Sequence, residues 1–255
     1  MSGGDPQPVK RKLQHMLQRA LGFDRYLYLF ARYKVRTLHR DIFEADVLHF
    51  ARMLPRDAMV LDIGANIGVM TVHLARQVSS GHVHSFEPMP ENYAALERVV
   101  RHYGLSNVTL HQMALGDADG DLEMVMPVMG SVRMQGLSRV VPAGGDAPDG
   151  QHRKVPERRL DDLDFLSGVP VAGIKIDVED FEQYVFLGGR KLIERWRPLV
   201  YTELGQGDNR PACLEFFEDL DYSVCVLEGD RLVSHVEGAH QKHNFFMLPP
   251  GHDLG

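Results

Sequence analysis

The sequence contains few cysteines, no long hydrophobic run and no overall excess of positive charge. Its 255 residues include only Cys213 and Cys225, too few for a disulfide framework, and we predict buried thiols in a reducing compartment. No segment reaches the apolar length needed to cross a bilayer and no signal peptide is recognisable, so we expect a cytoplasmic protein. The net charge of -7 argues against a general attraction to nucleic acid.

Positive charge is nevertheless concentrated near the N-terminus. Nine lysines and arginines lie between positions 10 and 40, where Asp24 is the single acidic residue. Leucines and aromatic residues recur there at near-helical spacing, so residues 1–56 are predicted to form a helical extension. Such a segment could lie on an anionic membrane surface or hold an acidic partner. We favour a cap over the edge of a binding site, or a contact within a homodimer.

The most informative stretch is a glycine-bearing turn after a short apolar run. Residues 59–61 are apolar, the next seven read Asp-Ile-Gly-Ala-Asn-Ile-Gly, and a helical pattern follows. This order opens a nucleotide-binding βαβ unit, whose glycines bring bare backbone against a ligand. Asn66 stands where a dinucleotide-binding site has its second glycine. A side chain at this position obstructs the close approach of a pyrophosphate. Asp62 suits a cation, so we predict S-adenosylmethionine as the ligand.

A second mark closes the next predicted strand. Residues 82–86 alternate as a strand and end in Glu87, about twenty residues after the turn. A carboxylate at this point can accept hydrogen bonds from both vicinal hydroxyls of a ribose. Glu87 could also be a solvated charge at a strand end, but together with the turn it predicts a ribose contact.

The rest of the chain alternates strands and helices. We expect strands at 108–115, 171–179, 198–203, 222–227, 231–236 and 244–248, a short hairpin strand at 122–126, and helices at 91–103, 181–196 and 214–220. This order predicts an α/β fold with a doubly wound, mostly parallel sheet and an antiparallel end. Residues 127–152 are rich in glycine, proline and serine, and we expect a long loop that acts as a lid.

Several short motifs follow one another in order from about residue 57 to the end. They are Asp62–Gly68, Phe86–Pro88, Ala114–Asp117, Leu160–Leu163, Lys175–Glu179, and Arg197-Pro198 followed by Glu203. They resemble the FkbM family of methyltransferases, for which Lys-Ile-Asp-Val-Glu is the most diagnostic motif. Asp180 departs from the family, which usually has glycine there.

The resemblance implies both a fold and an activity. Residues 57–255 would form a Rossmann-like class I methyltransferase domain that binds S-adenosylmethionine. Its reaction would be O-methylation of a hydroxyl on a sugar, a polyketide or another small secondary metabolite.

The resemblance also assigns contacts to individual residues. The implied cofactor contacts are Asp62, Gly64, Ala65 and Asn66 for the methionyl part, Glu87 for the ribose, Met113 and Ala114 for the adenine, Asp117 for the adenine amine, and Asp177 beside the cofactor. For Asp117 a plain turn role fits equally well.

Three carboxylates lie at the carboxyl ends of predicted strands and are candidates for catalysis. We hypothesise that Asp177, Glu179 and Glu203 position and deprotonate the acceptor hydroxyl. Glu179 would share a face with Asp177 only if strand pairing extends that far. The same carboxylates could hold magnesium, which we do not favour because a site needs more oxygen ligands. Alternatively, Glu179 and Glu203 cap helices or pair with Arg195 and Arg197.

Two other functions fit parts of the sequence. A methyltransferase acting on RNA or protein would need a basic face, which only the N-terminal segment offers. A nicotinamide oxidoreductase would need to admit a pyrophosphate, and Asn66 speaks against it. The acceptor itself is not encoded in a motif, so the prediction stops at a small-molecule hydroxyl.

Overall fold

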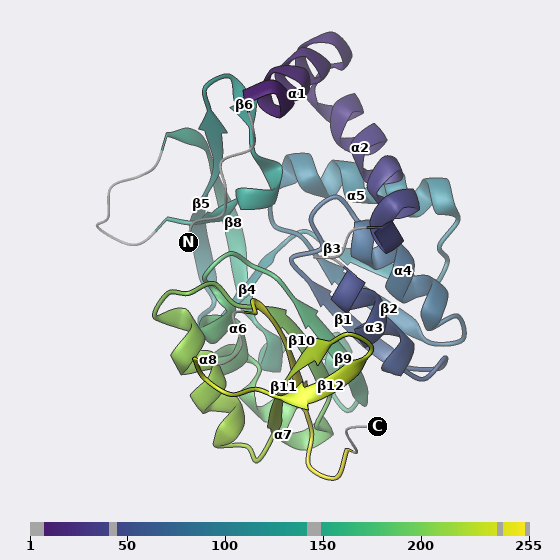
Figure 1. Cartoon of the computed structure of the whole chain (residues 1–255), viewed down its shortest axis with the longest axis vertical. Coiled ribbons are helices and arrows are strands. Elements are labelled where there is room, and N and C mark those ends of the chain that lie inside the picture. Colours follow the sequence, from purple (N-terminus) through teal and green to yellow (C-terminus); the bar gives the residue numbers. More distant parts are fainter. Residues whose placement is uncertain (1–7, 41–44, 142–148, 239–241, 253–255) are drawn as a thin grey trace.

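The computed structural model describes residues 8–40, 45–141, 149–238 and 242–252, and its main layer is a mixed sheet. The strands are β1 (Met59–Ile63), β2 (His82–Phe86), β3 (Val108–His111), β9 (Val171–Ile176), β10 (Leu199–Glu203), β11 (Ser223–Glu228), β12 (Arg231–Ser234) and β13 (Asn244–Leu248). Their order is β12-β11-β13-β10-β9-β1-β2-β3 (Figure 1). The five strands from β10 to β3 are parallel, and β13, β11 and β12 are antiparallel. The predicted doubly wound sheet with an antiparallel end is confirmed.

Helices cover both faces of this sheet because successive strand residues point to opposite sides. Val60 packs on one face with α3 (Ala45–Met53) and α4 (Val69–Gln77). Leu61 packs on the other face, which is covered by α6 (Glu182–Gly188), α7 (Arg190–Trp196) and α8 (Asn209–Glu218). Within the described ranges, no helix combines the length and the apolar character that a membrane span requires.

The first two helices of the chain lie outside these two layers, and the second of them packs on the layer that contains α4. α1 (Pro8–Leu21) and α2 (Phe23–Thr37) are joined at Gly22, and α5 (Pro90–Tyr103) follows β2. Leu27, Ala31 and Val35 of α2 are buried against α4 and α5 (Figure 1). The predicted helical extension is present, and its second helix is part of the packed molecule.

The long loop predicted at 127–152 is wrong for the residues that the structure describes. Together with the residues on either side they build a second sheet from β4 (Ala114–Gly116), β5 (Gly120–Met129), β6 (Val132–Arg133), β7 (Arg139–Val140) and β8 (Gly150–Arg159). β5 and β8 pair antiparallel, and Met124, Met126 and Val155 are buried together. Glycines and prolines concealed this strand pattern in the sequence. Residues 142–148 of the predicted loop lie outside the described residues.

Several predicted element boundaries are also corrected. The strand expected at 108–115 is two strands in two sheets, β3 and β4, separated at Gln112 and Met113. The helix expected at 181–196 is interrupted at Gly189, which ends α6 and begins α7. The strand expected at 171–179 ends at Ile176, because Glu179 and Asp180 adopt left-handed φ angles of 52° and 67°. The last helix begins at 209 instead of 214.

Two histidines form a neutral pair on the sheet surface. His84 Nδ1 of β2 lies 2.9 Å from His111 Nε2 of β3, so one ring donates and the other accepts. Both rings stack on Phe165, which lies in the short 3-10 helix η4 (Asp164–Leu166). Burial, and then repulsion between neighbouring histidines, lowers the pKa of each to about 4. The folded chain therefore resists protonation of a pair that the unfolded chain protonates near pH 6.5.

This pair should make the fold less stable in acid. As the pH falls from 6.5 towards 4, protons bind the unfolded chain first, so the free energy of unfolding decreases. We expect the double variant His84→Phe/His111→Phe to remove about 2 kcal/mol of this loss per histidine at pH 5, about 4 kcal/mol for the pair, or roughly 8–16 °C in Tm. Thermal unfolding of wild type and variant at pH 8 and pH 5 measures the difference. His252→Gln is the exposed control, and equal pH dependence in all three proteins would contradict the assignment.

Candidate active site

A cavity of about 280 Å³ opens at the carboxyl ends of β1, β9 and β10, and two smaller cavities continue it. Asn66 and Asp177 line both the large cavity and the second one, and Val178 lines the second and the third. Gly64 lines all three. In parallel α/β sheets ligands bind at this edge. The three cavities therefore form one elongated site along the strand ends.

The glycine turn is fixed by backbone contacts from both neighbouring strands. The amides of Gly64 and Ala65 donate to the Phe86 carbonyl at 3.0 and 2.9 Å. Gly64 has a φ of 72°, and a Cβ on it would collide with the carbonyl oxygen of Asp177. Asn66 also has a left-handed φ, of 50°, which asparagine tolerates better than most residues. The turn thus exposes backbone to the cavity, as the sequence predicts.

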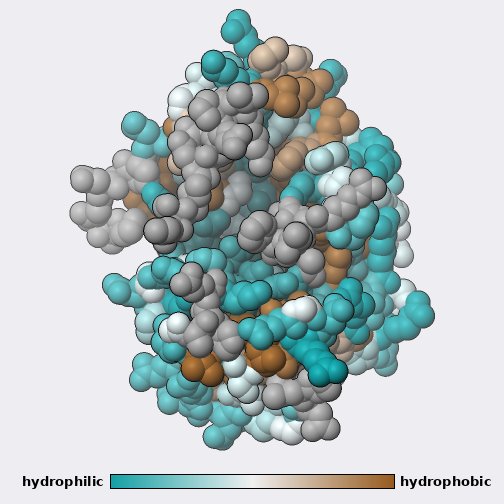
Figure 2. Space-filling model, viewed as in Figure 1, coloured by the Kyte–Doolittle hydropathy of each residue, from teal (hydrophilic) through white to brown (hydrophobic). Residues whose placement is uncertain are grey.

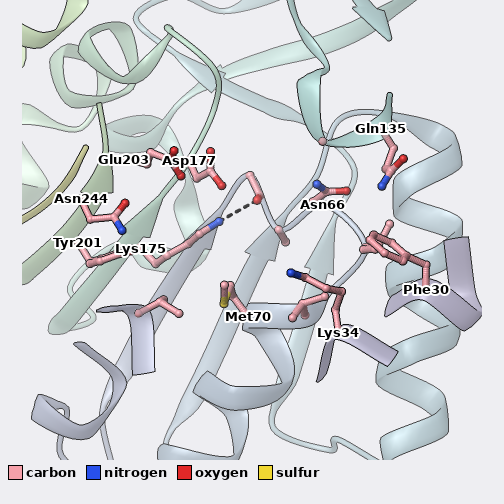
Figure 3. Close-up of a pocket in the computed structure, with 16 residues that line it drawn as sticks. Phe30, Lys34, Asn66, Met70, Gln135, Lys175, Asp177, Tyr201, Glu203 and Asn244 are labelled. Carbon is pink, nitrogen blue, oxygen red and sulfur yellow. Dashed lines mark hydrogen bonds between the residues drawn. The ribbon is translucent and has the colours of Figure 1, made fainter. Parts of the chain in front are cut away.

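A buried ion pair supports the turn from beneath. Asp62 is fully buried, accepts a hydrogen bond from Thr71 Oγ1 at 2.6 Å, and lies 3.4 Å from Lys175 Nζ. Lys175 Nζ also donates to the Gly64 carbonyl at 2.8 Å (Figure 3). Asp62 lines none of the three cavities, so the structure places it beneath the turn and not in a cavity wall. Lys175 does line the large cavity, and its site role was missed.

Glu87 is buried at the second cavity and tied to the turn. Its carboxylate accepts from the Asn66 amide at 2.8 Å, the Met89 amide at 2.9 Å and Asn92 Nδ2 at 3.4 Å. Burial nevertheless raises its pKa to about 7, because desolvation outweighs these hydrogen bonds. The predicted ribose residue therefore faces the site from the end of β2.

Three side-chain oxygens around the second cavity have no hydrogen-bond partner among the described residues. They are Asn66 Oδ1, Asn92 Oδ1 and Gln135 Oε1, all buried. Buried acceptors of this kind call for donors, and a ligand with hydroxyl and amine groups supplies them. Gln135 comes from the 3-10 helix η2 (Gln135–Leu137), inside the segment expected to be a loop, so the sequence analysis missed it. Asn92, five residues after Glu87, was missed as well.

The third cavity is lined almost entirely by apolar side chains. Met113, Ala114, Met124 and Phe181 are among its walls. Sulfur and aromatic faces of this kind suit a flat heteroaromatic ring. Asp117, in contrast, is exposed after β4 and lines none of the three cavities. The structure therefore places Asp117 in the exposed turn between β4 and β5, outside the cavity walls.

Acidic residues gather at the opposite end of the site. Asp177 and Glu203 follow adjacent strands and line the large cavity, with Tyr201 and Asn244 beside them (Figure 3). Glu179 lines the second cavity instead. Burial, and then repulsion from Asp177 and Glu203, raises the pKa of Glu179 to about 8. Asp177 and Glu203 therefore share one space, and Glu179 acts on it electrostatically from the adjoining one.

The arginines that we considered as alternative partners have other contacts. Arg195 lies over the ring of Trp196. Arg197 donates to the carbonyl oxygens of Glu194 and Leu220. Across the described part of the chain, no three His, Cys, Asp or Glu side chains form a group that could hold a metal ion.

Comparisons with known proteins bear on the identity of this site. A family model described as the methyltransferase FkbM domain matches residues 62–224. Methyltransferase 1 of Beauveria bassiana is 28% identical over 173 residues, covering 62% of this chain and 68% of that protein. Methyltransferase sdnD of Sordaria araneosa is 28% identical over 116 residues, covering 45% and 43%. The crystal structure of methyltransferase FkbM from Methylobacillus flagellatus has the same fold, with a TM-score of 0.52 at 17% identity. It covers 94% of this chain, which spans 59% of that one.

The glycine turn offers a matched test of its steric requirement. Gly64 and Gly104 both have left-handed φ angles, but only Gly64 has other atoms where a Cβ would lie. We expect Gly104→Ala to lower the free energy of unfolding by about 1 kcal/mol and Gly64→Ala by about 3 kcal/mol or more. Chemical denaturation measures both values. Equal losses would show that the contact with Asp177 does not constrain the turn.

Proposed function

This chain belongs to the FkbM family of methyltransferases, and we propose that it transfers a methyl group from S-adenosylmethionine to a hydroxyl of a small molecule. One observation carries the proposal. An elongated cavity runs along the strand ends from an apolar slot, past Glu87, to the carboxylates Asp177 and Glu203. Along its length the lining changes from apolar to hydrogen-bonding to acidic, which matches in turn the adenine base, the ribose and the reacting end of the donor.

The lining residues fit this methyl donor by chemistry and position. The apolar slot around Met113 and Ala114 would hold the adenine. Glu87 would accept the ribose hydroxyls, assisted by the unpartnered oxygens of Asn92 and Gln135. The turn that contains Gly64, Ala65 and Asn66 would hold the methionyl part. Asp62 would act through the turn, because it lines none of the three cavities.

The bound donor supplies a methyl group on a positively charged sulfur. The chain then has two tasks, which are to align the acceptor oxygen with that methyl group and to take the hydroxyl proton. Asp177 and Glu203 line the same cavity and are the groups that we assign to the proton. Phe30, Met70 and Tyr201 line the cavity with apolar surface, which excludes water from the reacting end.

We assign proton removal to carboxylates rather than to a metal. Magnesium would need several oxygen ligands, and no three His, Cys, Asp or Glu side chains of the described residues form a group that could hold it. Turnover in the presence of EDTA is the direct test of this choice.

Binding and transfer can be measured separately. S-adenosylhomocysteine should raise the Tm of the protein and NAD should not, since binding to the folded state stabilises it. Labelled methyl transfer to a panel of glycosides, glycolipid precursors and polyketides, with mass-spectrometric location of the product, would then identify the acceptor. A flat thermal response to S-adenosylhomocysteine would overturn the proposal at its first step.

The carboxylates at the reacting end should affect turnover more than donor binding. We expect Glu203→Gln and Asp177→Asn to lower kcat by about 10²–10⁴, the usual worth of a positioned acid or base. The Kd for S-adenosylhomocysteine should stay within about threefold for Glu203→Gln, because that product lacks the acceptor. Glu97→Gln, an exposed change on α5, is the control. Near-normal kcat in both amide variants would remove the assigned role.

Glu179 should give the reaction a recognisable pH dependence. With a pKa near 8 it is largely protonated at pH 7, and its ionised form attracts a cationic donor. We therefore expect kcat/KM to rise about tenfold between pH 7 and pH 9. In Glu179→Gln the rise in kcat/KM centred near pH 8 should disappear. The rise that remains should be the one due to ionisation of Glu87 near pH 7. Superimposable profiles of wild type and variant would contradict this.

A further inference from the structure

Helix α1 is oriented with its polar side towards the protein. Gln18 is only 9% exposed, and its side chain exchanges two hydrogen bonds of 3.1 Å with the backbone of Arg133. His15 Nδ1 lies 3.1 Å from the Ser131 carbonyl. The helix is therefore anchored to the β5–β6 hairpin through polar groups.

The apolar side of α1 consequently faces outward. Leu13, Met16 and Leu17 stand at positions i, i+3 and i+4, on one face, and are 57%, 65% and 40% exposed. A surface helix normally turns this face to the core. On α2, Leu29 and Tyr33 are one turn apart and are also exposed. Hydrophobic side chains gather over these two helices at the top of Figure 2.

Positive charge surrounds these apolar side chains. Between residues 12 and 37 the basic residues are Lys12, Arg19, Arg25, Arg32, Lys34 and Arg36, against the single acid Asp24. The chain as a whole has a net charge of -7, so this segment is opposite in sign to the rest. Lys12 and Arg19 are exposed on α1, and Arg25 and Arg36 are exposed on α2.

We propose that the outer face of α1 and α2 binds the surface of an anionic phospholipid bilayer. Exposed apolar side chains with a cationic border are what an interfacial helix presents to acyl chains and phosphates. A second copy of this chain is a poorer occupant. A two-fold contact through this face would bring two patches of the same positive sign together.

The proposed membrane face is connected to the cavity through α2. Phe30 and Lys34 line the large cavity, and each directly follows one of the exposed residues Leu29 and Tyr33. Binding through this face would hold the cavity close to the bilayer surface. The acceptor would then be a hydroxyl of a membrane-borne amphiphile, a consequence that rests on the proposed function.

Vesicle sedimentation with the full chain tests the surface without any methyl donor. We expect binding to vesicles of phosphatidylcholine mixed with phosphatidylglycerol, little binding to phosphatidylcholine alone, and weakening by salt. Leu13→Ser/Met16→Ser/Leu17→Ser should weaken partitioning about tenfold or more, and so should Arg19→Glu/Arg25→Glu/Arg36→Glu. Leu187→Ser/Val236→Ser removes exposed apolar side chains from α6 and from the segment after β12, and should bind like wild type.

The outcomes separate this inference from the proposed function. Retained stabilisation by S-adenosylhomocysteine in each variant shows that the fold and donor site are intact. Equal binding of wild type and the triple serine variant, equal binding to neutral and anionic vesicles, or no binding would overturn the membrane role. Light scattering that shows a dimer abolished by the serine changes, without vesicle binding, would assign the face to a second copy instead.

Discussion

The buried pair of Asp62 and Lys175 is the interaction on which the site depends. Both side chains lie beneath the glycine turn, and Lys175 is 4% exposed. Removing two charges from water is costly, and further hydrogen bonds to the ions offset part of that cost. Here Thr71 donates to Asp62 Oδ2, and the Ile63 and Gly64 carbonyls accept from Lys175. Asp62 Oδ1 has no hydrogen-bond partner among the described residues, and the ammonium 3.4 Å away is its compensating charge. The ammonium thereby ties the end of β1 to β9 and fixes the turn that borders all three cavities.

Around this fixed turn the site is electrostatically unusual. Burial raises the pKa values of Glu87, Glu179 and Glu182 to about 7, 8 and 7. A positive charge nearby would stabilise the ionised form of each of these carboxyls and lower its pKa again. The same acidic surroundings that disfavour a pyrophosphate thus favour a cationic donor, in agreement with the argument from Asp62 and Asn66 in the turn.

The sequence predicted the features that depend on local order. The turn, the succession of strands and helices along the chain and the position of Glu87 each follow from a short pattern of residues. Pairing over long distances was not predictable in this way. Asp62 and Lys175 are opposite each other only because β1 and β9 pair in that register, 113 positions apart. Gln135 reaches the site only because β5 and β8 form a second sheet.

The N-terminal helix illustrates a different limit. Its leucine spacing predicted a helix with two unlike faces, and the structure has that helix. Amphipathic spacing does not say which face is turned inward. That choice is decided by the hydrogen bonds of Gln18 to Arg133 in the β5–β6 hairpin. Arg133 lies in the segment 127–152, for which the sequence predicts a loop.

The loop after β9 shows how a departure from the family pattern is accommodated. Glu179 and Asp180 both have left-handed φ angles, a conformation that glycine adopts without strain and that costs other residues about 1–2 kcal/mol. Asp180 Oδ1 points to the loop after β10, where a Cβ on Gly205 would be 3.1 Å away. Asn209 at the start of α8 donates to Glu182 at the start of α6 at 2.6 Å, so the helices that follow these two loops are also joined. Gly205 therefore leaves room for the additional carboxylate, and the strained backbone keeps Glu179 at the cavity. Local strain of this kind persists where surrounding contacts impose it, and here those contacts join the loops that carry Asp177 and Glu203.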